Sequence, residues 1–158
     1  MKEEKEYTLI FCRRDDEVML GMKNRGFGVG KYNGFGGKIE AGETAVQGAI
    51  RELEEESGVI TSSLTKIGYL VFDMESSNKL MKVHVYETWK FEGNGVNTEE
   101  MTPQWFKVNE LPYQKMWPDD PYWIPLMLKN KKFKGQFQYS NDDTITTYTL
   151  NEVSADEL

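Results

Sequence analysis

Apolar and β-branched residues recur in short segments along the chain, and polar turns separate these segments. Tyr7–Arg13 and Val18–Lys23 flank the acidic turn Asp15–Glu17, which predicts an antiparallel hairpin. Further strands are predicted at Lys66–Met74, Leu80–Phe91, Trp105–Val108, Phe133–Tyr139 and Thr144–Leu150. No internal repeat and no Pro-, Gly- or Ser-rich linker divides the 158 residues, so a single domain, 1–158, is expected.

A helix is predicted over Ala45–Ser57, and a second, shorter helix over Tyr122–Leu128. Thr44 can cap the start of the first helix and Gly58 can end its last turn. Its apolar residues lie on one stripe that can pack against a sheet, namely Val46, Ala49, Ile50 and Leu53.

Charge and composition narrow the possible partners. The formal net charge of −7 and the pI near 4.9 argue against a nucleic-acid polymer, because binding a phosphate backbone normally needs a basic surface. No apolar run reaches the length of a membrane span, so no membrane partner is expected. Cys12 is the one cysteine, and its apolar neighbours indicate a buried thiol on a strand. These features favour a cytoplasmic protein, with the mitochondrial and nuclear nucleotide pools as alternatives.

The first helix carries a crowded acidic face. At about 100° per residue, Glu52, Glu55 and Glu56 fall within roughly 100° of one another, where like charges repel. A solvated acidic face is one interpretation, and a shared site for hard divalent cations, with Mg²⁺ as the first candidate, is the other. Arg51 lies three residues before Glu54 and four before Glu55, so its guanidinium can hold those carboxylates.

The full spacing around this helix resembles the Nudix box. Gly37 is followed after five residues by Glu43 and, after seven more, by Arg51-Glu52-Leu53; one residue then separates this triplet from Glu55-Glu56, and another precedes Gly58-Val59. The resemblance implies an α/β fold in which a mixed β-sheet lies between helices, and hydrolysis of a nucleoside diphosphate linked to another group. It also implies Mg²⁺ as cofactor, with Mn²⁺ as a substitute. The implied metal ligands are the carbonyl of Gly36 and the carboxylates of Glu52, Glu55, Glu56 and Glu100.

Glycine-rich segments precede the helix, but neither is a phosphate loop. Lys31 and Lys38 lack the glycine spacing of a Walker motif. The glycines are better explained by turns and by close approach of the backbone to a ligand, and the Gly36 carbonyl can reach a metal on the adjoining helix. Lys23 and Lys38 can meet phosphates, and a solvated lysine is the alternative for each.

The segment Met116–Trp123 has the residues of a base-binding slot. Trp117 can stack on a purine, while Pro118 fixes the backbone ahead of two carboxylates. If Asp119 and Asp120 lie together in an apolar pocket, they can share a proton, so the pair can accept from a guanine-like edge or donate to an adenine-like one. The alternative is an acidic turn that opens a short helix at Pro121.

Several further segments are similar to animal Nudix enzymes that hydrolyse oxidised purine nucleoside triphosphates, over nearly the whole chain. The segments are Tyr7–Leu9, Gly21–Lys23, Arg25–Gly28, Asn33–Lys38, Glu100–Met101 and Met116–Asp120. The resemblance implies a small-molecule purine substrate, such as 8-oxo-dGTP or 2-oxo-dATP, and a monomer. The nucleotide pocket would include Thr8, Lys23, Phe27, Asn33, Phe35, Gly36, Gly37, Lys38, Phe72, Met81, Trp117, Pro118, Asp119, Asp120 and Trp123.

The catalytic group expected from this reading comprises Glu56, Glu52, Glu55, Arg51 and Glu100. Glu56 is the first choice for the residue that orients or deprotonates the attacking water. Another Nudix substrate, such as a methylated purine nucleotide, ADP-ribose or a capped RNA end, is the alternative function. His84, the one histidine, lies in a strand and is interpreted as structural rather than as a ligand.

Overall fold

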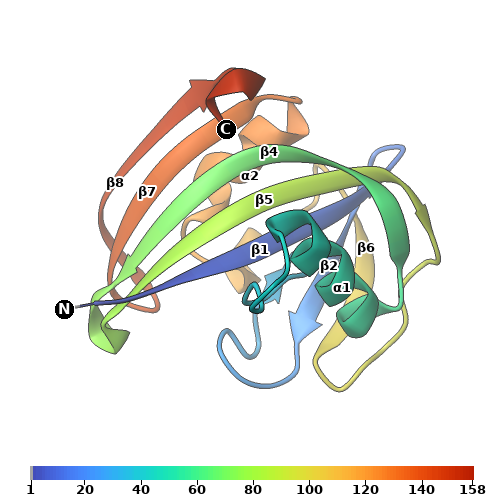
Figure 1. The fold of residues 1–158 in the computed structure, drawn as a ribbon, viewed down its shortest axis with the longest axis horizontal. Coiled ribbons are helices and arrows are strands. Elements are labelled where there is room, and N and C mark those ends of the chain that lie inside the picture. The colour runs from blue at the N-terminus through green and yellow to red at the C-terminus, as the bar shows by residue number, and fades with distance from the viewer. Residues whose placement is uncertain (1) are drawn as a thin grey trace.

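A single curved sheet of eight strands runs through the computed structural model, which describes residues 2–158, and one helix packs on each face (Figure 1). The strands are β1 (Glu3–Arg14), β2 (Glu17–Lys23), β3 (Tyr32–Asn33), β4 (Ile60–Met74), β5 (Lys79–Glu92), β6 (Met101–Lys107), β7 (Lys132–Asn141) and β8 (Thr144–Val153). The helices are α1 (Ala45–Ser57) and α2 (Asp120–Leu128), and three short 3₁₀ turns lie at η1 (Glu75–Ser77), η2 (Tyr113–Lys115) and η3 (Ala155–Glu157). The predicted α/β fold, a mixed sheet between helices, is confirmed.

The sheet has the strand order β3-β2-β1-β5-β4-β7-β8, and β6 pairs with β2. The pairs β1–β5 and β4–β7 are parallel, whereas the other pairs are antiparallel. The parallel β4–β7 pair brings the C-terminal hairpin β7–β8 beside the middle of the chain, with Phe72 opposite Phe137 and Met74 opposite Tyr139.

The predicted segments correspond to observed elements, and most observed strands are longer. The predicted strand at Lys66–Met74 begins earlier, at Ile60, because β4 continues through a polar stretch with three register shifts against β5. The two-residue strand β3 was not predicted, since two residues are too short to show an alternating pattern.

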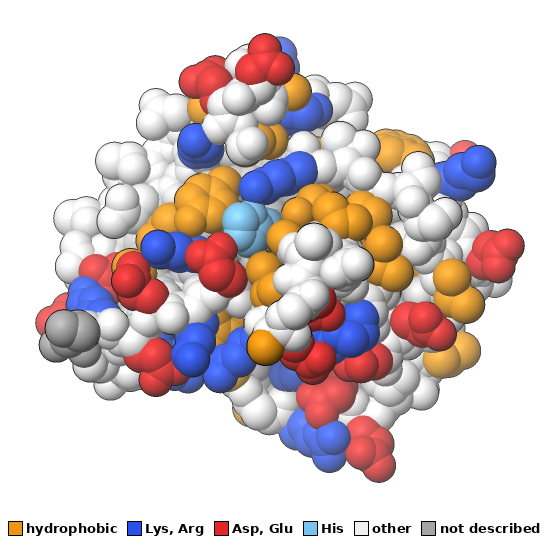
Figure 2. Space-filling model, viewed as in Figure 1, with side chains coloured by type: hydrophobic (Ala, Val, Ile, Leu, Met, Phe, Trp, Pro, Cys, Tyr) orange, Lys and Arg blue, Asp and Glu red, His pale blue; other side chains and the backbone are white. Residues whose placement is uncertain are grey.

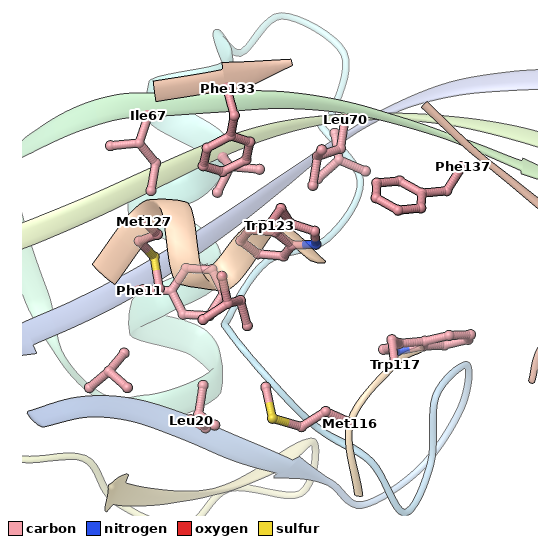
Figure 3. Close-up of a cluster of buried hydrophobic side chains, with 14 of the residues drawn as sticks. Phe11, Leu20, Ile67, Leu70, Met116, Trp117, Trp123, Met127, Phe133 and Phe137 are labelled. Carbon is pink, nitrogen blue, oxygen red and sulfur yellow. The ribbon is translucent and has the colours of Figure 1, made fainter. Parts of the chain in front are cut away.

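Two hydrophobic clusters fill the two sides of the sheet. Figure 3 shows the larger one, in which Trp123 and Met127 of α2 pack against Phe11, Leu70 and Phe133 of the strands. The smaller cluster lies beneath α1 and contains Ala49, Leu53, Ile10, Phe35 and Cys12. The prediction of a buried thiol on a strand is confirmed for Cys12, and burial raises the pKa of this thiol to about 12.

Both ends of α1 are capped as predicted. The Thr44 hydroxyl accepts from the Gln47 N–H at 3.1 Å, the Gln47 side chain accepts from the Thr44 N–H at 2.8 Å, and Gly58 takes φ 75° at the C-terminus. The predicted apolar stripe is wrong at Val46, whose side chain is 42 % exposed, because this residue precedes the first buried position of the helix, Gly48.

Neither helix is suited to cross a bilayer. Helix α1 has 13 residues and α2 has 9, and no helix within residues 2–158 combines the length and apolar character of a membrane span.

Candidate active site

A cavity of about 250 Å³ opens on the α2 side of the sheet and extends from aromatic side chains at one end to Glu56 at the other. Of the residues predicted to bind substrate, those at the aromatic end are Phe27, Phe72, Met81, Trp117, Asp119, Asp120 and Trp123. Those toward Glu56 are Thr8, Lys23, Asn33, Gly36 and Gly37. Residues that are far apart in the sequence therefore line one cavity.

An aromatic pair forms one wall of the cavity. The rings of Phe27 and Trp117 stack with centroids 5.0 Å apart and an interplanar angle of 28°. The ammonium of Lys31 lies 5.2 Å from the Trp117 ring centroid, within range of a cation–π interaction. Phe27 is 45 % exposed while Trp117 is 9 % exposed, so Phe27 is on the solvent side of the pair and covers the indole. The indole face is a surface on which a flat base can stack.

Asp119 is buried and accepts hydrogen bonds on both carboxyl oxygens. The indole N–H of Trp123 donates to Oδ2 at 2.7 Å, and the hydroxyl of Tyr139 donates to Oδ1. The Tyr139 oxygen itself accepts from the backbone N–H of Asp119 at 3.1 Å, so its one proton is committed to the carboxyl group. Two donors favour the ionised form of Asp119.

Asp120 is buried beside Asp119 but has a different environment. Burial raises its pKa well above the usual range, and the neighbouring Asp119 carboxylate raises it further. Burial also raises the pKa of Asp119, but the bonds from Tyr139 and Trp123 act in the opposite direction. Within the described part of the chain, Asp120 Oδ2 has no hydrogen-bond partner. The shared proton therefore belongs on Asp120, which can donate it into the cavity.

Glu56 is the acid of α1 that reaches the cavity. Its side chain is buried, and Oε1 accepts from the backbone N–H of Gly36 at 2.9 Å. Burial raises the pKa of Glu56 to about 7, and the charges of Glu52 and Glu100 add to this increase, whereas the Gly36 bond opposes it. A carboxylate with such a pKa is suited to take a proton near neutral pH.

Arg51 binds two further acids of this helix, and one that precedes it, from outside the cavity. Its guanidinium donates to Glu43 at 2.7 and 3.0 Å, to Glu52 at 3.0 Å and to Glu55 at 3.2 Å. These bonds raise the pKa of Arg51 and lower that of Glu43 to about 2. The expected contact with Glu55 is present, but Glu54 is not a partner; the other carboxylates come from Glu43 and Glu52, because the loop before α1 folds back over the helix.

Glu100 approaches from the start of β6. It accepts from Lys23 at 3.0 Å and from Arg25 at 2.7 Å, and these bonds lower its pKa. Lys23 also lines the cavity, and its charge acts on both Glu52 and Glu56. A cationic side chain therefore lies at the centre of the acids predicted to bind metal.

The donor set fits a hard divalent cation in its chemistry, because it consists of carboxylate and carbonyl oxygens. Gly37 leaves room for this set, since a Cβ there would lie 2.7 Å from Glu52 Oε1. Among residues 2–158, however, no three Asp, Glu, His or Cys side chains converge as ligands, and Glu55 and Glu100 form ion pairs with Arg51 and Lys23. The metal ligands Gly36, Glu52, Glu55, Glu56 and Glu100 stay a prediction.

Three residues predicted to contact substrate do not line the cavity. Phe35 is fully buried in the cluster beneath α1, on the other face of the sheet, so that prediction is wrong. Lys38 is exposed, and its carbonyl accepts from Arg51 at 3.2 Å. Pro118 connects Trp117 and Asp119, which line the cavity, but does not itself line it.

Sequence reasoning missed other residues of the cavity wall. They include Tyr7, Lys31, Val83 and Tyr139. Tyr139 is the most consequential, because it bonds to Asp119. The alternation of β7 gave a signal that Phe133, Phe137 and Tyr139 share a face, but their position opposite β4 depends on a long-range parallel pairing.

Comparison with known proteins gives consistent results over almost the whole chain. Residues 5–127 match the NUDIX domain family. The oxidized purine nucleoside triphosphate hydrolase of Mus musculus is 47 % identical over 149 residues, covering 94 % of this chain and 96 % of that protein. The protein of the same name from Danio rerio is 46 % identical over 146 residues, covering 92 % and 94 %.

A solved structure supports the fold. The crystal structure of a MutT protein from Bacillus halodurans superposes with a TM-score of 0.82 at 24 % identity, covering 93 % of this chain and 97 % of that one. The family match, the identity to the vertebrate relatives and the acidic helix beside the cavity lead to one assignment: this chain belongs to the Nudix family of hydrolases.

Proposed function

We propose that this protein hydrolyses oxidised purine nucleoside triphosphates to the nucleoside monophosphate and pyrophosphate, acting as a cytoplasmic monomer that removes mutagenic nucleotides before they enter DNA. The observation that carries the proposal is the unequal pair Asp119–Asp120 at the end of a cavity whose other end holds Glu56. The names of the mouse and zebrafish relatives support the same substrate class.

The base is read by stacking and by one acceptor and one donor. Trp117 offers its ring face, on which any purine can stack. Asp119, ionised, accepts an N–H from the purine edge, and Asp120, protonated, donates to an acceptor on the same edge. A buried pair of this kind discriminates strongly, since a base with the wrong edge leaves polar groups unpaired.

The triphosphate extends toward Lys23 and the acids of α1. Lys23 supplies a positive charge, and the backbone at Gly36 and Gly37 allows close approach. Nudix hydrolases use divalent metal ions; here we propose Mg²⁺, with Mn²⁺ as a substitute, on Glu52, Glu55, Glu56, Glu100 and the Gly36 carbonyl. When bound there, the cation would neutralise phosphate charge and acidify a water molecule.

In this proposal Glu56 accepts a proton from the attacking water. Its carboxylate is fixed by the Gly36 N–H, so its orientation does not depend on the substrate. Arg51 does not touch the cavity; it positions Glu52 and Glu55 by binding both carboxylates. The water oxygen bonds to a phosphorus beside the bridging oxygen, the bond from that phosphorus to the bridging oxygen breaks, and the water proton passes to Glu56, so the products are nucleoside monophosphate and pyrophosphate.

The decisive experiment is a turnover panel at a single pH, with and without Mg²⁺. Its substrates are 8-oxo-dGTP, 2-oxo-dATP, O6-methyl-dGTP, dGTP, dATP and ADP-ribose. We expect Mg²⁺-dependent release of pyrophosphate and a kcat/KM for oxidised purines at least about tenfold above that for dGTP and dATP. Equal turnover of dGTP and 8-oxo-dGTP, or a preference for ADP-ribose, would remove the proposal and favour another Nudix substrate.

A further inference from the structure

Three side chains outside the cavity form a hydrogen-bonded row on the α1 face of the sheet. Lys66 Nζ lies 2.9 Å from His84 Nδ1, and His84 Nε2 lies 2.6 Å from Glu6 Oε1. The three residues come from β4, β5 and β1, which are neighbours in the sheet. In Figure 2 the one histidine lies in the middle of the visible face, between hydrophobic side chains and close to both lysine and acidic groups.

The proton positions in this row follow from the donors. The Lys66 ammonium only donates, so His84 Nδ1 must accept, and the ring proton is on Nε2, facing the Glu6 carboxylate. This arrangement has a nucleophile beside a base that a third group orients, which is the arrangement that activates a nucleophile in covalent chemistry. When Lys66 is neutral, one of its N–H groups can keep the hydrogen bond to His84 Nδ1 while the lone pair of Nζ points to an electrophile.

The surroundings of Lys66 make its ammonium easier to deprotonate. Burial lowers its pKa, Lys134 of β7 lowers it further, and Glu6 of β1 opposes both. Tyr69 of β4 lies beside both groups, with its ring centroid 5.5 Å from Lys66 Nζ and 5.1 Å from the His84 ring centroid. Lys82, also on β5, completes a face that is locally basic in an acidic protein.

We propose that Lys66 is a nucleophilic amine that is acylated by acyl phosphates, with His84 as its general base and Glu6 as the group that orients the imidazole. The Nζ lone pair attacks the carbonyl carbon, the N–C bond forms, and the bond from that carbon to the phosphate oxygen breaks. Phosphate leaves with the electron pair, and the proton from Nζ passes to His84 Nδ1. Lys82 and Lys134 favour an anionic acyl donor over a neutral one.

The protein contains an internal control for this reaction. Lys82 lies on the same face, two residues from His84, but its Nζ lies 3.3 Å from Glu4 Oε1, and this contact raises its pKa. Full-length protein is treated with limiting acetyl phosphate, and the acetylation rate of each lysine is followed by peptide mass spectrometry. We expect Lys66 to react at least about tenfold faster than Lys82. Equal rates at the two lysines would overturn the proposal.

Two variants separate base catalysis from simple accessibility. In His84→Asn the side chain can still accept a hydrogen bond from Lys66 but cannot take its proton, so Lys66 should react several-fold more slowly while Lys82 is unchanged; the lowered pKa of Lys66 keeps it faster than Lys82. Glu6→Gln keeps a hydrogen-bond acceptor without the charge. Because the Glu6 charge also raises the pKa of Lys66, the two proteins are compared at the high-pH plateau, where Lys66 is neutral in both, and a partial fall is expected. This substitution is on a half-exposed side chain and decides the question even if His84→Asn does not fold.

An unchanged Lys66 rate in a folded His84→Asn or Glu6→Gln variant would refute the role of the row. Nucleotide hydrolysis plays no part in the assay, so its outcome is independent of the proposed function. Circular dichroism of each variant confirms that the compared proteins are folded.

Discussion

Tyr139 and Asp119 exchange two hydrogen bonds: the phenol donates to Asp119 Oδ1 and accepts from the Asp119 backbone N–H at 3.1 Å. The phenol has one proton, and the N–H leaves it no other direction to donate. Burial raises the pKa of Tyr139, and the charge of Asp119 raises it further, so the phenol stays neutral. The result is an acceptor fixed on Asp119 and a donor on Asp120.

The variant Tyr139→Phe should weaken discrimination between purine edges. Without the phenol, the proton can move between the two acids, so both hydrogen-bonding patterns become accessible. We expect the ratio of kcat/KM for 8-oxo-dGTP and 2-oxo-dATP to change by about tenfold, the equivalent of one hydrogen bond of ~1.4 kcal/mol. Tyr148→Phe, at a half-exposed tyrosine of β8, is the control. An equal loss on both substrates would mean that Tyr139 has only a structural role.

The free energy of unfolding of Asp120→Asn should increase relative to that of the wild type as pH rises. An acid whose pKa is raised in the folded state stabilises most below its unfolded pKa of about 3.8, and that contribution is lost as pH rises toward the folded pKa. The amide does not titrate. The stability difference, variant minus wild type, should therefore grow by up to ~1.4 kcal/mol per pH unit above pH ~4. Urea unfolding at several pH values measures it, and a pH-independent difference would contradict the assignment of the proton to Asp120.

Glu56→Gln should lower kcat by about 100-fold or more with little change in folding, because the amide cannot take a proton. Glu54→Gln removes an equal charge from the exposed side of the same helix and should leave kcat unchanged. Steady-state kinetics at saturating Mg²⁺ compares the two. Full turnover by Glu56→Gln would show that another group takes the proton.

Trp117→Leu should raise KM about tenfold while kcat changes little, because base stacking contributes ~1–3 kcal/mol to binding and is distant from the reacting phosphates. Trp89→Leu is a matched substitution at a half-exposed tryptophan of β5 that lies against Arg13, and its KM should equal that of the wild type. A normal KM in Trp117→Leu would exclude stacking on this ring.

Local patterns were sufficient for most of the fold and for part of the site. Alternation predicted the hairpin β1–β2, and the spacing of acids and glycines located α1 and Glu56, because these features depend on neighbours in sequence. The base-binding slot was also predicted from a short segment, Trp117 to Asp120. The irregular start of β4 and the two-residue strand β3 lacked any periodic signal.

The errors concern which face of the sheet a residue occupies. Phe35 is flanked by glycines that line the cavity, but its side chain turns to the opposite face of the sheet and packs beneath α1. Tyr139 was missed for the converse reason: its strand was predicted, but the parallel pairing with β4 that carries it to Asp119 is not encoded in any short segment. The contact of Arg51 with Glu43 was missed because it depends on how the loop before α1 folds back over the helix.

The family match ends at residue 127, before β7 begins at Lys132. Of the two side chains that donate to Asp119, Trp123 lies inside the matched segment and Tyr139 lies beyond it. A fragment that stops short of β7 would therefore keep both acids and the Trp123 indole but lack the phenol. The environment of Asp119 is complete only when β7 has paired with β4.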